Sequence, residues 1–307
     1  IMPYYSPLRY PGGKRRLANF IKLIYAGNGL SDGHYIELYA GGAAIALELL
    51  FDGFVSHAHI NDLDRSIYAF WYSVLHETDR LCEQIRTTEV TIDEWYYQKE
   101  IQEQREAVSL FNLGFSTFFL NRTNRSGIIE GGVIGGKNQD GKYKIHARFN
   151  KTDLIHRIRH IGRYQNRISI YNEDAADFIV ELLPRFPVET LVYLDPPYYD
   201  KGGELYKNSY EHKDHEKISQ LISTVDHKWI ISYDNTPEIR DIYAGRPFLV
   251  YDLHYSAADR YEGSEIIFFC DDRVIPDVDN PAKVDKDIAE RSDQVAYTQP
   301  KFNVFDK

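Results

Sequence analysis

The most constraining feature of the chain is the segment Asp195–Tyr198 (D-P-P-Y), which follows the apolar, β-prone run Leu191–Leu194. Consecutive prolines remove backbone donors and resist continuation into a helix, so the segment is expected to be a rigid loop at the end of a strand. Open α/β sheets bind their ligands at the carboxyl ends of strands. The loop therefore predicts both a fold class and the position of a site, although an ordinary proline-rich turn after a core strand is the alternative.

Apolar runs and helical periodicity alternate along most of the chain, as in a sheet whose strands are joined by helices. This alternation predicts an α/β fold, with a doubly wound, mostly parallel, Rossmann-like sheet covered on both faces. The expected strands are Tyr35–Ala40, His57–Asp62, Arg167–Tyr171, Leu191–Leu194, Trp229–Tyr233, Phe248–Leu253 and Glu265–Cys270, and the expected helices are Ala43–Leu50, Arg65–His76, Ala175–Leu183 and His215–Val225.

A mainly helical block interrupts the alternation and is interpreted as an inserted domain covering residues 65–165. Within it, residues 126–149 are rich in glycine and β-forming residues, which predicts a hairpin or an ordered loop. The core domain is then expected to combine residues 1–64 and 166–275, and the acid-rich residues 276–307 are expected to form a polar tail.

Composition places the chain among ordinary globular proteins, with 307 residues of which 43% are hydrophobic. The only cysteines, Cys82 and Cys270, lie far apart, which predicts neither a disulfide framework nor a metal site and fits a reducing, cytoplasmic compartment. The first residues do not predict an apolar leader segment, and no apolar run is long enough to cross a bilayer, so no membrane association is expected.

The charge is distributed unevenly, and this distribution matters more than the net value of −10. Residues 1–30 carry five lysines and arginines and no acid, and residues 121–167 carry eleven against three acids. Basic segments in an otherwise acidic protein predict a surface for a phosphate backbone, with a solvated helix face as the alternative. The alternative is favoured for Arg157, Arg159 and Arg163 taken alone.

Two further motifs contain the residues expected around a nucleotide-like ligand. The first is Arg9–Lys14 (R-Y-P-G-G-K), in which adjacent glycines allow close approach of a ligand and Lys14 adds positive charge. The second is Glu37–Ala43 (E-L-Y-A-G-G-A), at the exit of the first expected strand, where doubly wound sheets form their nucleotide crevice. Neither has the spacing of a phosphate-binding P-loop or of a dinucleotide fingerprint.

Acidic residues at two other strand ends fit the same crevice. Asp62 ends the second expected strand, where an acid commonly accepts ribose hydroxyls. Asp174 ends another strand and could accept a hydrogen bond from an adenine amine. For both residues, N-capping of the following helix is an equally good interpretation.

The four residues of D-P-P-Y suit one kind of target, an exocyclic amine on a planar base. Asp195 can accept from the amine, the prolines leave carbonyl oxygens exposed as acceptors, and Tyr198 can stack on a flat ring. Taken in order, R-Y-P-G-G-K, E-x-Y-x-G-G, a long insertion and D-P-P-Y resemble the Dam-type N6-adenine methyltransferases, in the alpha group of DNA amino-methyltransferases. Residues 119–128 of the insertion and the stretch from Gly141 to Asn150 also resemble that family's target-recognition domain.

The resemblance implies that the chain transfers a methyl group from S-adenosylmethionine to the N6 amine of an adenine flipped out of double-stranded DNA. It implies catalytic roles for Asp195, Pro196, Pro197 and Tyr198. It implies cofactor binding by Tyr10, Gly12, Gly13, Lys14, Glu37, Tyr39, Ala40, Gly41, Gly42, Asp62, Asp174 and Asp195. It implies DNA contacts by Arg9, Lys14, Asn121, Arg122, Asn124, Arg125, Lys142, Lys144 and Arg148.

Some alternatives remain open at this point. Transfer to cytosine N4 or to RNA uses similar chemistry, a silent DNA-binding module could keep the fold, and a nicotinamide or flavin oxidoreductase could share the crevice. The polar run Thr123–Ser126 differs from the aromatic, glycine-rich stretch of GATC-methylating members, so a GATC target is not predicted. A monomer in a prokaryotic or phage-infected cell, with a cognate restriction endonuclease encoded nearby, is the expected setting.

Overall fold

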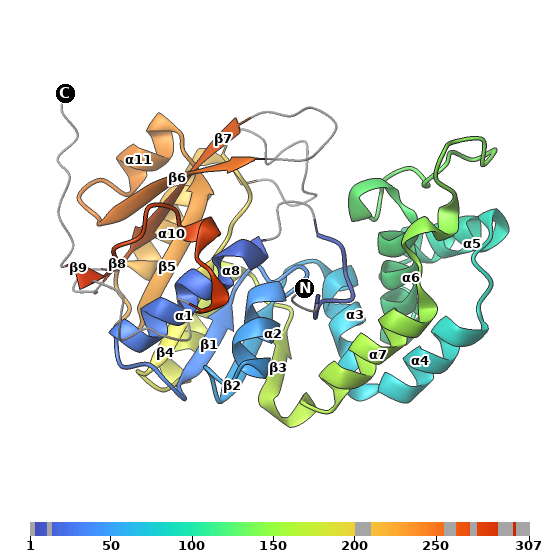
Figure 1. The fold of residues 1–307 in the computed structure, drawn as a ribbon, viewed down its shortest axis with the longest axis horizontal. Coiled ribbons are helices and arrows are strands. Elements are labelled where there is room, and N and C mark those ends of the chain that lie inside the picture. The colour runs from blue at the N-terminus through green and yellow to red at the C-terminus, as the bar shows by residue number, and fades with distance from the viewer. Residues whose placement is uncertain are drawn as a thin grey trace. The chain divides into compact units, whose positions relative to one another are not determined.

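A computed structural model describes residues 4–10, 14–199, 210–254, 262–270, 275–287 and 297–298 (Figure 1). The chain divides into two compact units. Unit 1 comprises Ile1–Gly13, Ala40–Leu47 and Ile60–Asn172, and unit 2 comprises Lys14–Tyr39, Glu48–His59 and Glu173–Lys307. No described helix is both long and apolar enough to span a bilayer.

A seven-stranded sheet has the order β3-β2-β1-β4-β5-β7-β6. β1 pairs in parallel with β4 and β4 with β5, whereas β7 is antiparallel to both β5 and β6. This confirms the expected mostly parallel α/β fold. The strands are β1 (His34–Glu37), β2 (His57–Asn61), β3 (Ile168–Tyr171), β4 (Thr190–Leu194), β5 (Lys228–Asp234), β6 (Phe248–His254) and β7 (Glu262–Phe269).

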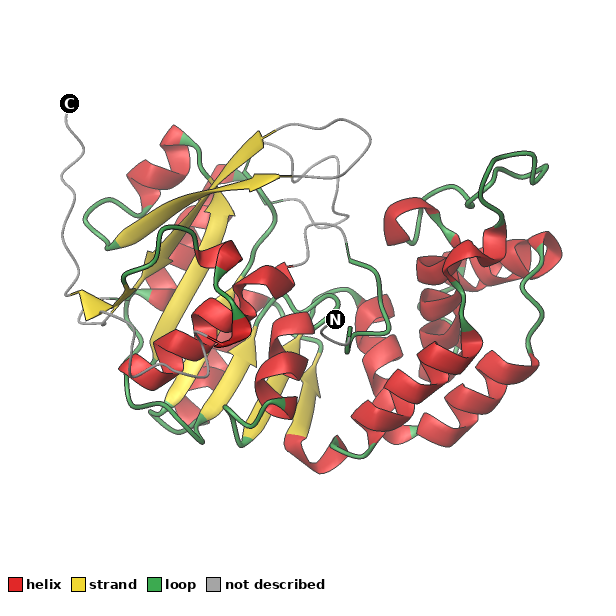
Figure 2. Ribbon diagram, viewed as in Figure 1, coloured by secondary structure: helices red, strands yellow, loops and turns green. Residues whose placement is uncertain are grey.

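The order of the strands reverses between β1 and β4, so the segment that leaves β4 lies at the topological switch point where such sheets bind ligands. β4 is buried along its whole length, which explains its continuous apolar sequence. In unit 2, α1 (Ala18–Gly27) lies in front of the strands in Figure 2 and α10 (His212–Ile222) lies behind them. The remaining helical segments of this unit are η1 (Lys14–Leu17), α8 (Ala175–Asp177), the π-helical η5 (Phe178–Leu182), η6 (Leu183–Arg185), α11 (Pro237–Ile242) and η7 (Pro281–Lys283).

Unit 1 is mainly helical. Its helices are α3 (Arg65–His76), α4 (Thr78–Thr87), α5 (Ile92–Glu103), α6 (Leu110–Thr123) and α7 (Lys151–Gly162), and α2 (Ala44–Phe51) begins in this unit. α6 is buried on most of its surface and packs against α3 and α5. The bounds of α3 are those expected from its apolar spacing, and Asp64 caps its first turn by accepting from Ser66 N at 2.9 Å.

The hairpin expected within residues 126–149 is not formed. The segment is an ordered loop with short turns η2 (Arg125–Gly127) and η3 (Ile145–Arg148), and it makes one isolated antiparallel bridge between Asn124 and Val133. Tight turns explain the difference, because Ser126, Gly127, Gly135 and Gly136 all have positive φ values that interrupt an extended strand. The glycines therefore serve turns and not strand pairing.

Part of the expected polar tail is packed. Val284 and Pro281 are buried, and Asn19 Nδ2 donates to Val284 O at 2.9 Å, which joins the segment to α1. A short antiparallel pair joins β8 (Ile275–Pro276) to β9 (Tyr297–Thr298). Residues 276–287 are therefore not polar throughout, because the side chains of Pro281 and Val284 are buried.

Candidate active site and nucleic-acid surface

The D-P-P-Y loop follows β4 directly, and two side chains of the neighbouring strand β5 hold it. Ser232 Oγ donates to Asp195 Oδ1 at 2.8 Å, and Asp234 Oδ1 accepts from Tyr199 N at 2.9 Å. Ser232 and Asp234 are two residues apart, so they project from the same face of β5. The loop is therefore fixed at its first residue and just after its last one.

The Asp195 carboxylate is oriented by a chain of hydroxyls. The hydroxyls of Tyr193 and Ser232 lie 2.8 Å apart, and because Ser232 uses its only proton on Asp195, Tyr193 is the donor between them. Lys14 Nζ lies 3.5 Å from the same oxygen, Oδ1. Among the described residues, Oδ2 has no recorded partner, so one carboxylate oxygen is held in place and the other remains available to accept.

Beneath the loop lies a buried cluster, defined here as Lys14, Tyr198, Tyr251 and Glu265. Glu265 Oε2 accepts from Lys14 Nζ and from the Tyr251 hydroxyl, both at 2.6 Å. Glu265 Oε1 accepts from the Tyr198 hydroxyl at 2.5 Å, and Lys14 Nζ donates to that same hydroxyl at 3.0 Å. The side chains of Lys14 and Glu265 are 4% and 1% exposed, so their charges interact without bulk water.

Lys14 is therefore not a surface residue. All three of its ammonium protons have partners within unit 2, on Asp195, Tyr198 and Glu265. Lys14 was expected to contact DNA phosphate or the cofactor, but its ammonium group is occupied by Tyr198, Glu265 and Asp195. The sequence motif alone did not reveal that Glu265 would bury it.

The two carboxylates near Lys14 titrate in opposite directions. Burial raises the pKa of Asp195 to about 6, since the attraction of Lys14 only partly offsets burial and the repulsion from Glu265. Burial also disfavours ionised Glu265, but Lys14 and the two tyrosine hydroxyls outweigh it and lower the pKa of Glu265. Lys14 itself is buried, yet Asp195, Tyr198 and Glu265 raise its pKa well above the usual value. At neutral pH all three groups are charged.

Unit 1 contains the glycine turn expected at the exit of β1. Gly41 has φ 46°, and a Cβ atom there would lie 2.6 Å from the ring of Tyr10, so only glycine fits. The turn is fixed by Asp62, whose Oδ2 accepts from Gly41 N at 2.8 Å, and by Trp71, whose Nε1 donates to Gly41 O at 2.9 Å. Ala40 and Gly42 belong to the same turn, in which Ala43 N donates to Ala40 O at 2.6 Å.

Asp62 supports this turn and does not cap α3, a role that Asp64 fulfils. Its Oδ1 accepts from Asp64 N at 2.9 Å. Each oxygen keeps a second lone pair, so the carboxylate can also accept from ligand hydroxyls. Burial, with repulsion from Asp64, raises the pKa of Asp62 to about 7.

The other expected cofactor residues lie in unit 2 or outside the described residues. Glu37 is buried at the end of β1, and the Tyr39 hydroxyl lies 2.8 Å from that of Tyr210. Asp174 caps α8 by accepting from Ala176 N at 2.9 Å, which is the alternative noted from the sequence. Gly12 and Gly13 lie outside the described residues.

Two asparagines expected to contact DNA instead hold unit 1 together. Asn121 Oδ1 accepts from Arg9 N and its Nδ2 donates to Arg9 O, both at 2.7 Å, so one amide clamps the Arg9 peptide. Asn124 is fully buried; its Oδ1 accepts from Trp95 Nε1 at 2.7 Å, and its Nδ2 donates to Ile128 O and Ile129 O. Asn121 Nδ2 also donates to Gly127 O at 2.8 Å, so both amides are already bonded within unit 1, and neither residue is kept among the proposed DNA contacts.

The arginines and lysines expected to contact DNA divide into partly buried and exposed groups. Arg122 donates to Arg148 O at 2.7 Å and to Pro7 O at 3.4 Å, and burial with nearby arginines lowers its pKa to about 10. Arg9, clamped by Asn121, also donates to Asn124 O at 3.1 Å, and burial with Arg148 lowers its pKa. The exposed residues among those expected to contact DNA are Arg125, Lys142, Lys144 and Arg148, which we call the basic loop.

The sequence did not single out Ser232, Asp234, Tyr251 or Glu265. One sequence feature could have pointed to Glu265: it is a charged residue directly before the apolar run Ile266–Phe269 of an expected strand. A charged residue among buried strand positions needs a buried partner. The partner, Lys14, lies 251 residues away in the chain and could not be found by spacing.

The chain matches the family described as D12 class N6 adenine-specific DNA methyltransferase over residues 10–259. It belongs to this family. It is also 23% identical, over 226 residues, to the type II methyltransferase M.CviBI of Paramecium bursaria Chlorella virus NC1A, a match that covers 72% of this chain and 80% of the relative.

Two solved structures show weaker similarity. PH1948 of Pyrococcus horikoshii is 10% identical with a TM-score of 0.38 and coverage of 81% of this chain and 79% of that one. TrmK of M. capricolum, solved with S-adenosylhomocysteine, is 7% identical with a TM-score of 0.33 and coverage of 84% and 68%. The assignment rests on the family match.

This D12-class protein is thus an S-adenosylmethionine-dependent enzyme that methylates adenine in DNA. The resemblance found in the order of its motifs is confirmed.

Proposed function

We propose that Asp195, the Pro196 carbonyl and Tyr198 hold the N6 amine of a flipped-out adenine for methyl transfer. One observation carries the assignment: Asp195 Oδ1 is fixed by Ser232 and Lys14, while Oδ2 is without a partner among the described residues, at the switch point of the sheet. An amine conjugated to a ring is a poor nucleophile. Acceptors that bind both amine hydrogens direct its lone pair toward the incoming methyl group.

The residues present fit S-adenosylmethionine, which supplies an electrophilic methyl group on a sulfonium when bound. Asp62 offers lone pairs to ribose hydroxyls, and the glycine turn at Gly41 lets backbone approach the ligand without a side chain between them. The aromatic rings of Tyr10 and Tyr39 suit a sulfonium cation through cation–π attraction. Glu37, Ala40, Gly42 and Asp174 complete the proposed cofactor residues, with Gly12 and Gly13 outside the described part of the chain.

The proposed mechanism needs positioning and electrostatics and no covalent enzyme intermediate. Asp195, as a carboxylate, accepts a hydrogen bond from one N–H of the amine, and the Pro196 carbonyl accepts one from the other. Pro197 stiffens the loop, and Tyr198 stacks on the base. The experiment that tests the assignment is transfer of a labelled methyl group to duplex DNA, followed by mass spectrometry of the nucleosides.

The raised pKa of Asp195 predicts how transfer depends on pH. Because its pKa is about 6, the acceptor carboxylate becomes a neutral acid as pH falls through that value. We expect the single-turnover rate to be constant above pH 7 and about tenfold lower at pH 5, at saturating DNA and cofactor. Circular dichroism at each pH controls for unfolding. A rate that stays constant from pH 5 to pH 8 would exclude Asp195 as the titrating acceptor.

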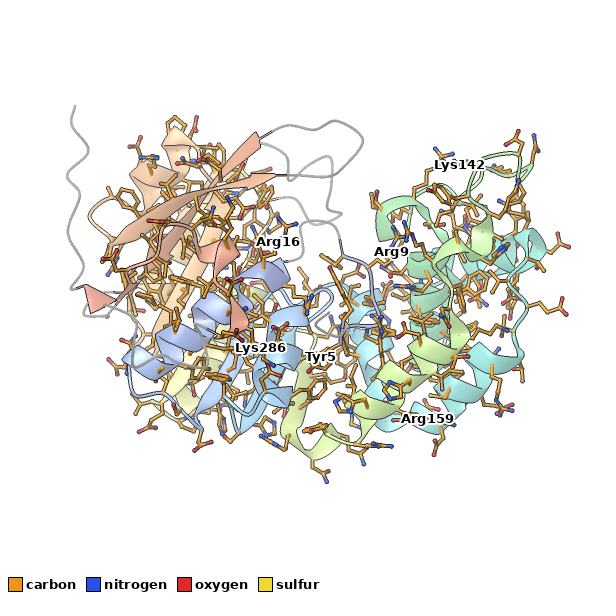
Figure 3. The ribbon with its side chains drawn as sticks, viewed as in Figure 1. Tyr5, Arg9, Arg16, Lys142, Arg159 and Lys286 are labelled. Atoms are coloured by element: carbon orange, nitrogen blue, oxygen red, sulfur yellow. The ribbon has the colours of Figure 1, made fainter. Side chains whose placement is uncertain are left out.

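We also propose that the basic loop and Arg9 contact the DNA backbone. Figure 3 shows Arg9 and Lys142 toward one side of unit 1 and Arg159 at the other end of its helices. Arg159 on α7 lies outside the basic loop and, like Arg125, is exposed, so it supplies a matched control.

Replacing Arg125 by alanine is expected to weaken DNA binding several-fold and to lower the slope of log K against log salt by about 1. Arg159→Ala removes the same charge and should leave both quantities unchanged. Fluorescence anisotropy with a labelled duplex at several salt concentrations makes the measurement. Equal weakening by the two variants would show that overall charge, and not the basic loop, determines binding.

The oligomeric state, the cellular compartment and the partners of the enzyme are also proposals. We infer a monomer acting on double-stranded DNA in the cytoplasm of a prokaryotic or phage-infected cell, with residues 65–165 as the target-recognition domain. The designation of M.CviBI as a type II methyltransferase supports a cognate restriction endonuclease. Long-read sequencing of DNA from a methylation-deficient host that expresses the chain identifies the recognition site.

A further inference from the structure

Glu265 is buried on β7, the strand next to the edge strand β6, where an uncharged side chain would ordinarily be expected. In the ladder of β5, β7 and β6 it pairs with Asp234 on one side and with Tyr251 on the other. The residues that follow it, Ile266–Phe269, are all buried and apolar. A buried ion pair contributes little net stability compared with well-packed apolar residues, so stability alone does not account for a carboxylate at this position.

Two contacts of Glu265, with Tyr198 and with Lys14, lead to the proposed active site. Its Oε1 accepts the Tyr198 hydroxyl at 2.5 Å, a distance typical of a charge-assisted bond, and its Oε2 holds Lys14 at 2.6 Å. Lys14 in turn donates to Tyr198 and lies 3.5 Å from Asp195 Oδ1. The Tyr198 hydroxyl thus both donates and accepts within the cluster, which fixes the ring in one orientation.

We propose that Glu265 is a positioning residue for methyl transfer: it locks the ring of Tyr198 for stacking and shares Lys14 with Asp195. The proposal rests on the roles proposed above for Asp195 and Tyr198. Glu265 touches neither substrate nor cofactor in this account and acts only through its partners.

The shared lysine links Glu265 to the basicity of Asp195. Lys14 lies closer to Glu265, at 2.6 Å, than to Asp195, at 3.5 Å. Glu265 therefore weakens the attraction by which Lys14 stabilises the ionised form of Asp195. Repulsion from Glu265 acts on Asp195 in the same direction. The titratable groups around Asp195 are Lys14 on η1, Tyr35 on β1, Tyr193 on β4, Tyr198 in the loop, Tyr251 on β6 and Glu265 on β7.

Glu265→Gln tests the proposal through the pH profile, which a merely structural residue would not move. With the carboxylate gone, Lys14 acts on Asp195 alone, so the acid limb of the single-turnover profile should shift to lower pH. The plateau rate should fall about tenfold or more, with KM for DNA changed less than about twofold. Glu238→Gln, at an exposed position in the first turn of α11, is the matched control and should behave as wild type.

Tyr198→Phe gives a second test should Glu265→Gln not fold. It keeps the stacking ring and removes only the hydroxyl that joins it to Glu265 and Lys14. A severalfold lower plateau rate with unchanged KM for DNA is expected. Wild-type rates in Tyr198→Phe would show that the ring needs no anchoring through its hydroxyl and would overturn the proposal.

Asp195→Asn in the same assay separates this inference from the function beneath it. Suppose that Asp195→Asn is inactive while Glu265→Gln retains the wild-type rate and the wild-type acid limb. That result would refute the positioning role of Glu265 and leave the proposed role of Asp195 intact. An active Asp195→Asn would instead refute the proposed role of Asp195. A loss confined to KM in Glu265→Gln would also contradict positioning, since it would place Glu265 in substrate binding.

Discussion

Asp195→Asn is expected to abolish methyl transfer and, at neutral pH, to make the protein more stable. The loss of transfer follows because an amide presents at most one acceptor atom, and its NH2 group cannot accept from an amine. Removing a positioned transition-state acceptor of this kind costs about 10²–10³ in rate, and more where several contacts act together.

The gain in stability follows from the direction of the pKa shift. The folded-state pKa of Asp195 is raised from 3.8 to about 6, so the carboxyl group favours folding when it is protonated. That contribution is complete at low pH and is lost as pH rises through about 6, which makes the ionised group a cost at pH 7.5. With the side chain 23% exposed, the cost relieved by asparagine is about 1–3 kcal/mol.

Urea unfolding at pH 7.5 and pH 5 measures this difference, and Asp226→Asn at an exposed position is the matched control. The free energy of unfolding of Asp195→Asn should exceed that of wild type at pH 7.5, by a margin that shrinks at pH 5. An Asp195→Asn protein that is less stable than wild type at pH 7.5 would show that the aspartate is held mainly by stabilising contacts.

Lys14→Met is expected to lower the free energy of unfolding by about 3–5 kcal/mol at pH 7.5. The substitution leaves Glu265 ionised in a site that is 1% exposed, with hydroxyl donors but no counter-charge. Loss of Lys14 raises the pKa of Glu265, so Glu265 becomes protonated at a higher pH. Protonation removes the unpaired buried charge. The destabilisation should therefore diminish as pH falls.

The double variant Lys14→Met, Glu265→Gln removes both charges and should recover a large part of the lost stability. Lys217→Met, on the exposed face of α10, controls for loss of a lysine in unit 2 and should be neutral. Urea titrations of the four proteins provide the comparison. The account of a buried, mutually dependent pair fails if the double variant is less stable than Lys14→Met.

The sequence was sufficient to predict those parts of the candidate site whose residues lie close together in the chain. D-P-P-Y after an apolar run predicted the loop at the end of β4, and the glycine turn predicted the position of Gly41. The sequence was insufficient for residues that depend on distant partners. Lys14 looked like a surface cation because Glu265, which buries it, is remote in sequence.

The asparagines illustrate the same limit. Asn121 and Asn124 belong to residue types that read base edges, but their amides are consumed by backbone groups of unit 1. Composition cannot show whether a polar side chain is already bonded. The exposed basic loop, by contrast, follows from local charge alone.

The most direct test of the proposed active site is mass spectrometry of nucleosides after the enzyme has acted on mixed-sequence duplex DNA and on RNA with labelled S-adenosylmethionine. The account predicts labelled N6-methyladenine from the duplex and none from the Asp195→Asn variant. Labelled N4-methylcytosine, labelling of RNA only, or undiminished labelling by Asp195→Asn would contradict it.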